Sequence, residues 1–281
     1  MTRLRQAILV LLAAGLTARC STTTTEPAAQ LGTLEAGSPD TSSGDVDARV
    51  EAAPLPAVDA GFRQLFDGVS LAGWDRYLGI PVGESAPLGL ENDPRGVYSV
   101  TTVDGEPAIR ISGEVWGALI SKEEYADFEL RLEYKFGSAV WPPLNAQDSG
   151  VMVLSTGPLG AVNAGGPTLS NPIGSGAFMV SVEFQLAGAD IGGLYNLGPI
   201  SMQTTPRTWV PPIPSAWNKI VILVRGNSSQ HFLNGELVTS ASGYETHWPA
   251  EPVVPLTRGK IQLQSEGAET YFRHIEIRPS R

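Results

Sequence analysis

The chain has 281 residues and a net charge of -10 at neutral pH. An acidic protein of this kind repels phosphate backbones and anionic lipids, so neither nucleic acid nor a membrane surface is expected as its partner. The chain contains a single cysteine, Cys20, so disulfides cannot form a framework and burial of apolar side chains must hold the fold together.

Residues 1–20 have the form of an export signal. Two arginines precede the apolar run of residues 7–16, which is too short to span a bilayer. Cys20 stands where a bacterial lipoprotein carries its acylated residue, although Arg19 replaces the small residue that usually precedes it. Acylation of Cys20 and its removal with the signal both stay open. We expect an exported protein of the cell envelope or periplasm, lipid-anchored if Cys20 is acylated and otherwise secreted.

Residues 21–60 are composed mainly of Thr, Ser, Ala, Pro and acidic residues, with no apolar periodicity. Such a segment cannot bury enough apolar surface to offset its chain entropy, so we predict a disordered linker. Residues 61–281 have the length of one large domain. Their many glycines and prolines fall between short alternating runs, which is typical of an all-β sandwich.

Several runs alternate between apolar and polar residues and therefore predict half-buried strands. Residues 128–136, 180–185 and 261–264 each place apolar side chains on one face and charged or amide side chains on the other. Residues 217–238 predict two strands of a hairpin with a turn at Gly-Asn-Ser-Ser. In residues 121–125, SKEEY, a serine followed by acids predicts one short helical turn.

Motifs spread along residues 61–281 resemble the 3-keto-disaccharide hydrolase family. In chain order they are GFRQLFDGVSLAGWD (61–75), LISKEEYADFELRLEYKF (119–136), AQDSGVMVL (146–154), SVEFQL (181–186), GGLYN (192–196) and GKIQLQSEGAETYFRHIEI (259–277). Each motif alone is weak, but together their order and spacing are specific. The resemblance implies a secreted bacterial protein with a concanavalin-like jelly roll, a sandwich of two antiparallel sheets.

Two positions depart from the family pattern. Glu266 stands where the family often has a histidine, in a Leu-Gln-x-His-Gly string near its end. Leu154 stands where an arginine commonly closes the Asn-Ser-Gly-Ile strand. If those two groups take part in the chemistry, this chain either performs it differently or has lost it.

The resemblance implies hydrolysis of glycosidic bonds in 3-keto-disaccharides or 3-keto-glycosides. The ketone acidifies the hydrogen on C2, so a base can remove it, the glycosidic oxygen can leave from C1, and water can then add back. Such an enzyme needs a base beside C2 and a cation or hydrogen-bond donor at the enolate oxygen. The rival hypothesis is a carbohydrate-binding module without catalysis, since concanavalin-like sandwiches serve both roles. Either way, a carbohydrate is the expected partner.

Glu183 and Gln185 lie two residues apart on a predicted strand, so they share a face opposite Val182 and Phe184. A partly desolvated Glu183 could serve as the base, with Gln185 binding sugar hydroxyls. The alternative is a buried glutamate that only satisfies a cation such as Arg131.

Gln264 and Glu266 repeat this geometry on the last core strand, which makes Glu266 a candidate second acid or base and Gln264 a candidate substrate ligand. The alternative for Glu266 is a solvated turn carboxylate. Lys122 matches the family's lysine and could hold the enolate oxygen, against the alternative of a solvated charge.

The remaining substrate-binding candidates are Trp116 and Tyr195 as ring platforms and Arg131, Asp148 and Ser149 as polar ligands. Aromatic residues are more often core than platform, so that alternative stays open. Asp148 and Ser149 precede a strand, where they could bind a hydroxyl or a calcium ion, and we leave metal and cofactor undetermined. The three histidines lack metal-ligand spacing, which argues against zinc hydrolysis.

Overall fold

The computed structural model describes residues 61–162 and 176–280. The predicted export signal with Cys20, the predicted linker and part of the loop after the strand at residues 150–156 lie outside these residues, so those predictions stay predictions. Within the described part of the chain, no helix has the length and apolar character that crossing a membrane requires.

The described residues are built almost wholly from antiparallel strands, which form two sheets. The ten-stranded sheet contains β12 (Ile200–Thr204), β15 (Glu236–Thr246), β14 (Ser228–Leu233), β13 (Asn218–Arg225), β8 (Phe128–Val140), β18 (Ala268–Pro279), β5 (Glu106–Ile111) and β4 (Tyr98–Val103), with β1 (Arg63–Gln64) beside β18 and β16 (Val254–Pro255) beside β15. The eight-stranded sheet contains β11 (Leu194–Leu197), β10 (Val180–Gln185), β9 (Gly150–Thr156), β17 (Arg258–Ser265), β6 (Gly117–Ser121), β2 (Trp74–Leu78) and β3 (Gly89–Leu90), with β7 (Tyr125–Ala126) beside β17. The all-β sandwich predicted from the sequence is confirmed.

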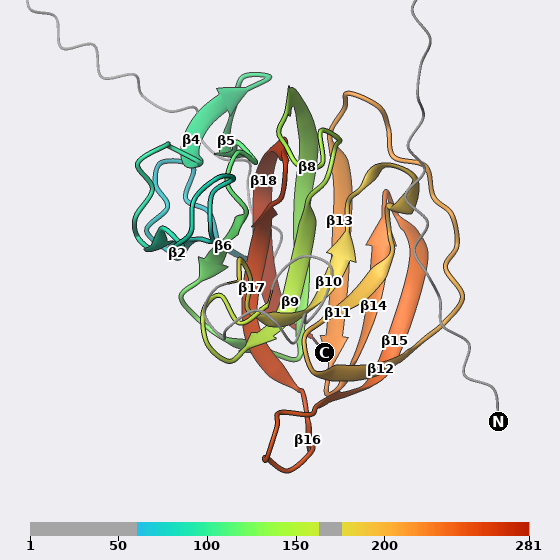
Figure 1. Ribbon diagram of the computed structural model, residues 1–281. Helices are drawn as coiled ribbons and strands as arrows, with labels where there is room; N and C mark the ends of the chain where they lie inside the picture. Colours follow the sequence, from blue (N-terminus) through green and yellow to red (C-terminus); the bar gives the residue numbers. More distant parts are fainter. Residues whose placement is uncertain (1–60, 163–175, 281) are drawn as a thin grey trace, which may run out of the picture. The chain divides into compact units, whose positions relative to one another are not determined.

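The two sheets pack face to face around one apolar core (Figure 1). The alternation in β8 buries Leu130 and Leu132, and the alternation in β10 buries Val182 and Phe184. The Phe184 ring stacks on the buried ring of His231 in β14, with ring centroids 5.2 Å apart, so the sheets meet there. Burial lowers the pKa of His231 to about 3, which keeps this core histidine neutral.

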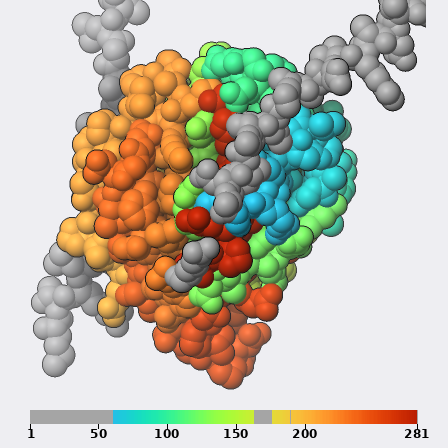
Figure 2. Space-filling view, turned by 180° about the vertical axis from the view of Figure 1, so that it is seen from behind, coloured from blue at the N-terminus to red at the C-terminus, as the bar shows by residue number. Residues whose placement is uncertain are grey.

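Strands distant in sequence lie side by side, as a jelly roll requires. β8 pairs with both β13 and β18, which places the middle of the chain between two later strands. β1 pairs with β18, so the first and last strands of the domain adjoin, blue against red in Figure 2. Such nonlocal pairing is what assembles side chains from separate motifs on one surface.

Two local predictions need correction. Residues 121–125 form a bend between β6 and β7 instead of a helical turn, because Ser121 belongs to β6 and its hydroxyl donates to the carbonyl of Glu123, 2.8 Å away. In the hairpin, β14 already begins at Ser228, so the turn is shorter than Gly-Asn-Ser-Ser. The one helical element in the described residues is a 3-10 turn at Gly188–Asp190.

Candidate functional site

The site begins with Glu183, whose side chain lies on the outer face of the eight-stranded sheet. Val182 and Phe184 point into the core, so strand alternation turns Glu183 and Gln185 away from it. Glu183 pairs in register with Met152 of β9 on one side and with Tyr195 of β11 on the other. Although it faces outward, Glu183 is only 4% exposed, so this carboxylate is removed from water.

Gly150 makes the close approach of Glu183 and Gln264 geometrically feasible. A Cβ at this position would lie 2.5 Å from Oε1 of Glu183 and 2.9 Å from Oε1 of Gln264, distances that real Cβ atoms essentially never show. Glycine therefore leaves the space that both side chains occupy above β9. Sequence reasoning treated Gly150 only as part of a motif and missed this role.

Asp148 and Glu266 complete a cluster of three carboxylates with Glu183. Asp148 comes just before β9, and Glu266 directly follows β17 and is 6% exposed. The charge of Asp148 acts on both glutamates, and the charge of Glu183 acts on Glu266, which places the three groups near one another. The structure thus brings together residues from three separate sequence motifs.

The carboxylates of the cluster hold protons more tightly than ordinary acids do. Burial is the main cause, and it raises the pKa of Glu183 to about 8, with the charges of Asp148 and Asp190 adding to the shift. Burial raises the pKa of Asp148 to about 6. Burial and the two neighbouring carboxylates also raise the pKa of Glu266 well above its usual range. At neutral pH the cluster therefore contains ionised and protonated carboxyl groups side by side.

Three polar atoms of the cluster and of the neighbouring Gln264 are buried and make no hydrogen bond within the described residues. They are Oε1 of Glu183, Oε1 of Gln264 and Oδ1 of Asp148. A buried acceptor without a donor costs stability, and such groups are rare unless another molecule supplies the donor. The hydroxyl groups of a sugar are donors of the required kind.

Tyr195 stands beside Glu183 and is fixed by two charged residues that sequence reasoning missed. Its hydroxyl donates to the carboxylate of Asp190, and Nη1 of Arg207 donates to Oδ1 of Asp190 at 2.7 Å. Arg207 also donates to the backbone carbonyl of Asp190 at 3.0 Å. Tyr195 keeps 42% of its surface exposed, so a ring held in place borders the carboxylate cluster. Neither Asp190 nor Arg207 falls in an alternating pattern that could have identified it.

Trp116 directly precedes β6, next to the Glu266 end of the site. Gln264 pairs with Ala118, and alternation places Trp116 on the same outer face. The indole Nε1 is buried and has no hydrogen-bond partner among the described residues. The ring is partly buried and packs against the core, so only part of its surface is accessible.

Two predicted site residues lie away from the carboxylate cluster. Arg131 is on the outer face of the ten-stranded sheet, where its guanidinium lies 4.0 Å from the centre of the Phe62 ring and pairs with Glu129. Lys122 follows β6, three strands from β10, and lines a separate cavity near Trp74.

Ser149 is fully buried, and its hydroxyl donates to the backbone carbonyl of Gln264 at 3.0 Å, so it ties β9 to β17. Gln185 shares the face of Glu183, and its side-chain oxygen accepts a hydrogen bond from the Leu186 amide. The described residues contain no group of three or more His, Cys, Asp or Glu side chains arranged to hold a metal ion.

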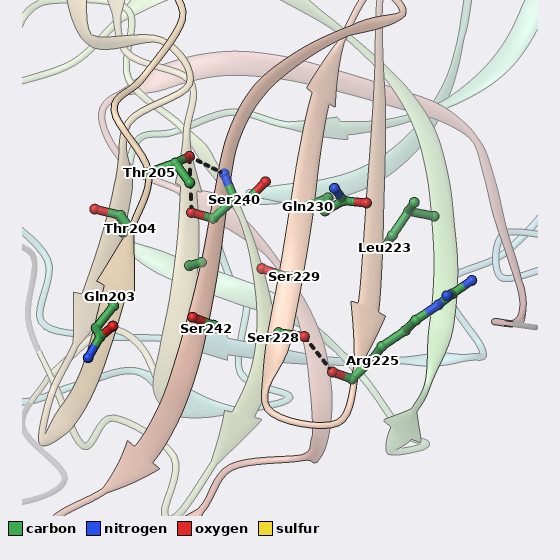
Figure 3. Close-up of a pocket in the computed structure, with 11 residues that line it drawn as sticks. Gln203, Thr204, Thr205, Leu223, Arg225, Ser228, Ser229, Gln230, Ser240 and Ser242 are labelled. Carbon is green, nitrogen blue, oxygen red and sulfur yellow. Dashed lines mark hydrogen bonds between the residues drawn. The ribbon is translucent and has the colours of Figure 1, made fainter.

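A second cavity, of about 530 Å³, lies on the ten-stranded sheet across β12, β15, β14 and β13 (Figure 3). Hydroxyl and amide side chains line it, among them Thr205, Ser228, Gln230 and Ser240, and Arg225 lines it at the β13 side. Ser228 donates to the carbonyl of Arg225 at 2.7 Å, and the Thr205 hydroxyl accepts from the Ser240 amide at 3.0 Å. Its described lining contains no carboxylate, so the acid-base candidates all lie on the other sheet.

Comparison with solved structures gives matches at low identity. A candidate glycosyl hydrolase from Parabacteroides distasonis is 20% identical, with a TM-score of 0.49 over 79% of this chain and 94% of that chain. A second one from the same organism is 24% identical, with a TM-score of 0.41 over 65% and 90%. A carbohydrate-binding module from Bacillus subtilis is 9% identical, with a TM-score of 0.39 over 64% and 91%. A comparison with curated proteins gave no match.

The comparison with protein families covers nearly all of the folded domain. The profile of the 3-keto-alpha-glucoside-1,2-lyase-like domain matches residues 61–278, a range that includes both sheets and the whole carboxylate cluster. The resemblance drawn from the sequence motifs is thereby confirmed, and the chain belongs to the 3-keto-disaccharide hydrolase family of 3-keto-alpha-glucoside-1,2-lyase-like domains.

Proposed function

We propose that this domain cleaves the glycosidic bond of 3-keto-glycosides by elimination followed by addition of water. The observation that carries the proposal is the buried cluster of Asp148, Glu183 and Glu266 on the outer face of the eight-stranded sheet. Family membership supports a carbohydrate substrate that carries a 3-keto group. The cluster supplies the proton acceptor and proton donors that such a substrate needs.

Asp148 is the base in this proposal. It is the least buried of the three carboxyl groups, and its pKa of about 6 leaves it ionised at pH 7. A base is most effective when its pKa lies near the working pH, because it must be both deprotonated and basic. This revises the sequence-based hypothesis, in which Glu183 was the base.

Glu183 is the donor at the enolate oxygen. Its pKa of about 8 keeps the carboxyl group protonated at pH 7, so it can donate a hydrogen bond to the oxygen on C3. A neutral carboxylic acid in an apolar site can stabilise an enolate without a nearby cation. Lys122, to which the sequence assigned this task, lies three strands away from β10.

The reaction then proceeds in two balanced stages. Asp148 takes the proton from C2, the electron pair forms the C2–C3 enolate, and its collapse expels the oxygen on C1 and creates a C1–C2 double bond. The departing oxygen receives a proton from Glu266, the third acid of the cluster, whose pKa burial raises well above its usual range. Water adds its oxygen to C1 while C2 regains a proton, so the net change is hydrolysis.

The direct test follows the hydrogen on C2. The purified domain is incubated in deuterium oxide with a 3-keto-glucoside and, separately, with the same glucoside carrying a 3-hydroxyl group. The expected result is release of the aglycone and incorporation of deuterium at C2 for the keto substrate alone. Cleavage of both substrates without deuterium at C2 would mean an ordinary glycosidase mechanism and would overturn the proposal.

A carbohydrate-binding module without catalysis is the second candidate function. It is favoured by the departures at Leu154 and Glu266, which replace two charged or titratable residues typical of the family. Leu154 is fully buried in the apolar core, so no polar group from that position reaches a ligand. Under this alternative the domain binds the keto-glycoside while neither product nor exchanged substrate accumulates.

A further inference from the structure

A small cavity lies beside Trp116, between three segments that surround one end of the eight-stranded sheet. It has a volume of about 180 Å³ and is lined by Ile80, Val82, Glu114, Val115, Trp116 and Pro143. Glu114 is already paired with Arg95, whose Nη1 donates to it at 2.9 Å. The other lining side chains are apolar apart from the indole of Trp116, whose N–H is buried and has no hydrogen-bond partner among the described residues.

The cavity adjoins the carboxylate cluster through two of its walls. Trp116 precedes Gly117, which pairs with Ser265, so Trp116 and Glu266 meet at the ends of two neighbouring strands. Pro143 belongs to the same connection between β8 and β9 that contains Asp148. Because Glu266 is the proposed proton donor to the departing oxygen on C1, the group that leaves with this oxygen lies beside Glu266 and its neighbour Trp116.

We propose that this cavity is the subsite for the leaving group, and that it selects glycosides with an apolar, single-ring aglycone. The proposal rests on the proposed elimination reaction for the identity of the group that occupies it. A second sugar would bring several hydroxyl groups against aliphatic walls that cannot pair with them, which is unfavourable. An aromatic ring instead covers the apolar side chains of Val82 and Ile80.

Val82 allows a test that spares the fold, because its side chain is 64% exposed and lies in a connecting segment. Val82→Asp places a carboxylate at the cavity wall. Val69→Asp is the matched control, since Val69 is 70% exposed in another connecting segment and lines none of the cavities described above. The substrates are phenyl and methyl 3-keto-glucosides of the same anomeric configuration.

The measured quantity is the ratio of kcat/KM for the phenyl and methyl substrates. Because each variant is compared with the parent, differences in leaving-group reactivity cancel. Val82→Asp should lower the ratio by about tenfold, as expected for loss of one buried apolar ring, while Val69→Asp leaves it unchanged. An unchanged ratio in Val82→Asp, with both substrates still cleaved, overturns the subsite while the proposed function stands.

A binding measurement separates the two proposals. Titration of the domain with the unoxidised phenyl and methyl glucosides requires no turnover. If no keto-glucoside is cleaved but the parent binds the phenyl glucoside about tenfold more tightly than Val82→Asp does, the subsite holds and the catalytic proposal fails. Equal affinity of the parent and Val82→Asp for the phenyl glucoside overturns the subsite in either case.

Discussion

The outer faces of the two sheets treat their carboxylates in opposite ways. On the ten-stranded sheet, Glu133 accepts a hydrogen bond from Nε of Arg273 at 2.8 Å and lies 3.3 Å from Nδ1 of His274. The hydrogen bond with His274 and the neighbouring Arg273 lower the pKa of Glu133 to about 2. On the eight-stranded sheet, burial raises the pKa of Glu183 to about 8. Cations pair with Glu133, whereas Glu183 is buried, which is unfavourable for its ionised form.

This difference indicates that the charged groups on the ten-stranded sheet stabilise the fold, whereas those on the eight-stranded sheet are suited to chemistry. The arrangement around Glu133 extends to Glu129, whose carboxylate pairs with Arg131 and Arg278 on the same face. Paired charges of this kind hold strands in register and leave no group available for a substrate. A cluster of buried acids with raised pKa values is unfavourable for folding and is typical of functional sites.

The largest expected effect comes from removing the proposed base. Asp148→Asn keeps the shape of the side chain but cannot accept the C2 proton, so kcat/KM for a 3-keto-glucoside should fall by about 100-fold or more. Glu183→Gln keeps an N–H donor for the enolate oxygen, so its kcat/KM should fall by only about tenfold. The control is Asp104→Asn, since Asp104 pairs with Lys135 on the other sheet and should leave the rate within about twofold. A more damaging Glu183→Gln would restore Glu183 as the base.

A smaller loss should follow from crowding the site without touching its acids. Gly150→Ala adds a Cβ 2.5 Å from Oε1 of Glu183 and must displace that carboxyl group, so kcat/KM should fall by about 10- to 100-fold. Gly73→Ala is the matched control, because its new Cβ meets the Leu65 carbonyl at an ordinary 3.5 Å. Thermal unfolding of both variants shows whether each stays folded. Full activity in a folded Gly150→Ala variant would contradict the need for this close approach.

The pH dependence should follow the two roles assigned to the cluster. Asp148 must be deprotonated, so kcat/KM rises with pH up to about pH 6, and Glu183 must be protonated, so kcat/KM falls above about pH 8. Each limb changes activity by about tenfold per pH unit. The alkaline limb should be absent in Glu183→Gln, because an amide does not titrate. An acidic limb with its midpoint near the usual carboxylate pKa of ~4.3 would show that Asp148 is not desolvated during catalysis.

The smallest effect is on stability, and it should have opposite signs on the two sheets. The raised pKa of Glu183 penalises the fold increasingly as pH rises from about 4.5 to about 8, so Glu183→Gln should raise the free energy of unfolding at pH 7 by roughly 1–3 kcal/mol. The lowered pKa of Glu133 stabilises the fold above about 4.5, and this contribution is lost as pH falls toward about 2.

Glu133→Gln should therefore lower the free energy of unfolding at pH 7, by about 1 kcal/mol once solvent screening of this partly exposed group is allowed for. Urea denaturation at pH 7 and pH 4 measures both differences. The stabilising effect of Glu183→Gln should disappear at pH 4. Destabilisation by both variants to the same extent would mean that the two faces do not differ in the way described.

The sequence predicted which residues form strands better than it predicted which side chains contact one another. Alternation in residues 128–136 and 180–185 correctly separated buried from outward positions, because period two is a local property of a strand. The same alternation gave Arg131 and Glu183 equivalent outward positions, although they lie on opposite sheets. Local periodicity carries no information about which sheet a strand joins.

By itself, the sequence determined the all-β class, the family and the outward orientation of Glu183 and Gln264. Only the tertiary structure decided that Asp148 joins these residues, that Lys122 and Arg131 do not, and that Asp190 holds Tyr195 beside them. The physical reason is that strand order in a jelly roll is set by pairing between distant segments. Burial at the resulting contacts, which no single segment encodes, then sets the pKa of each acid.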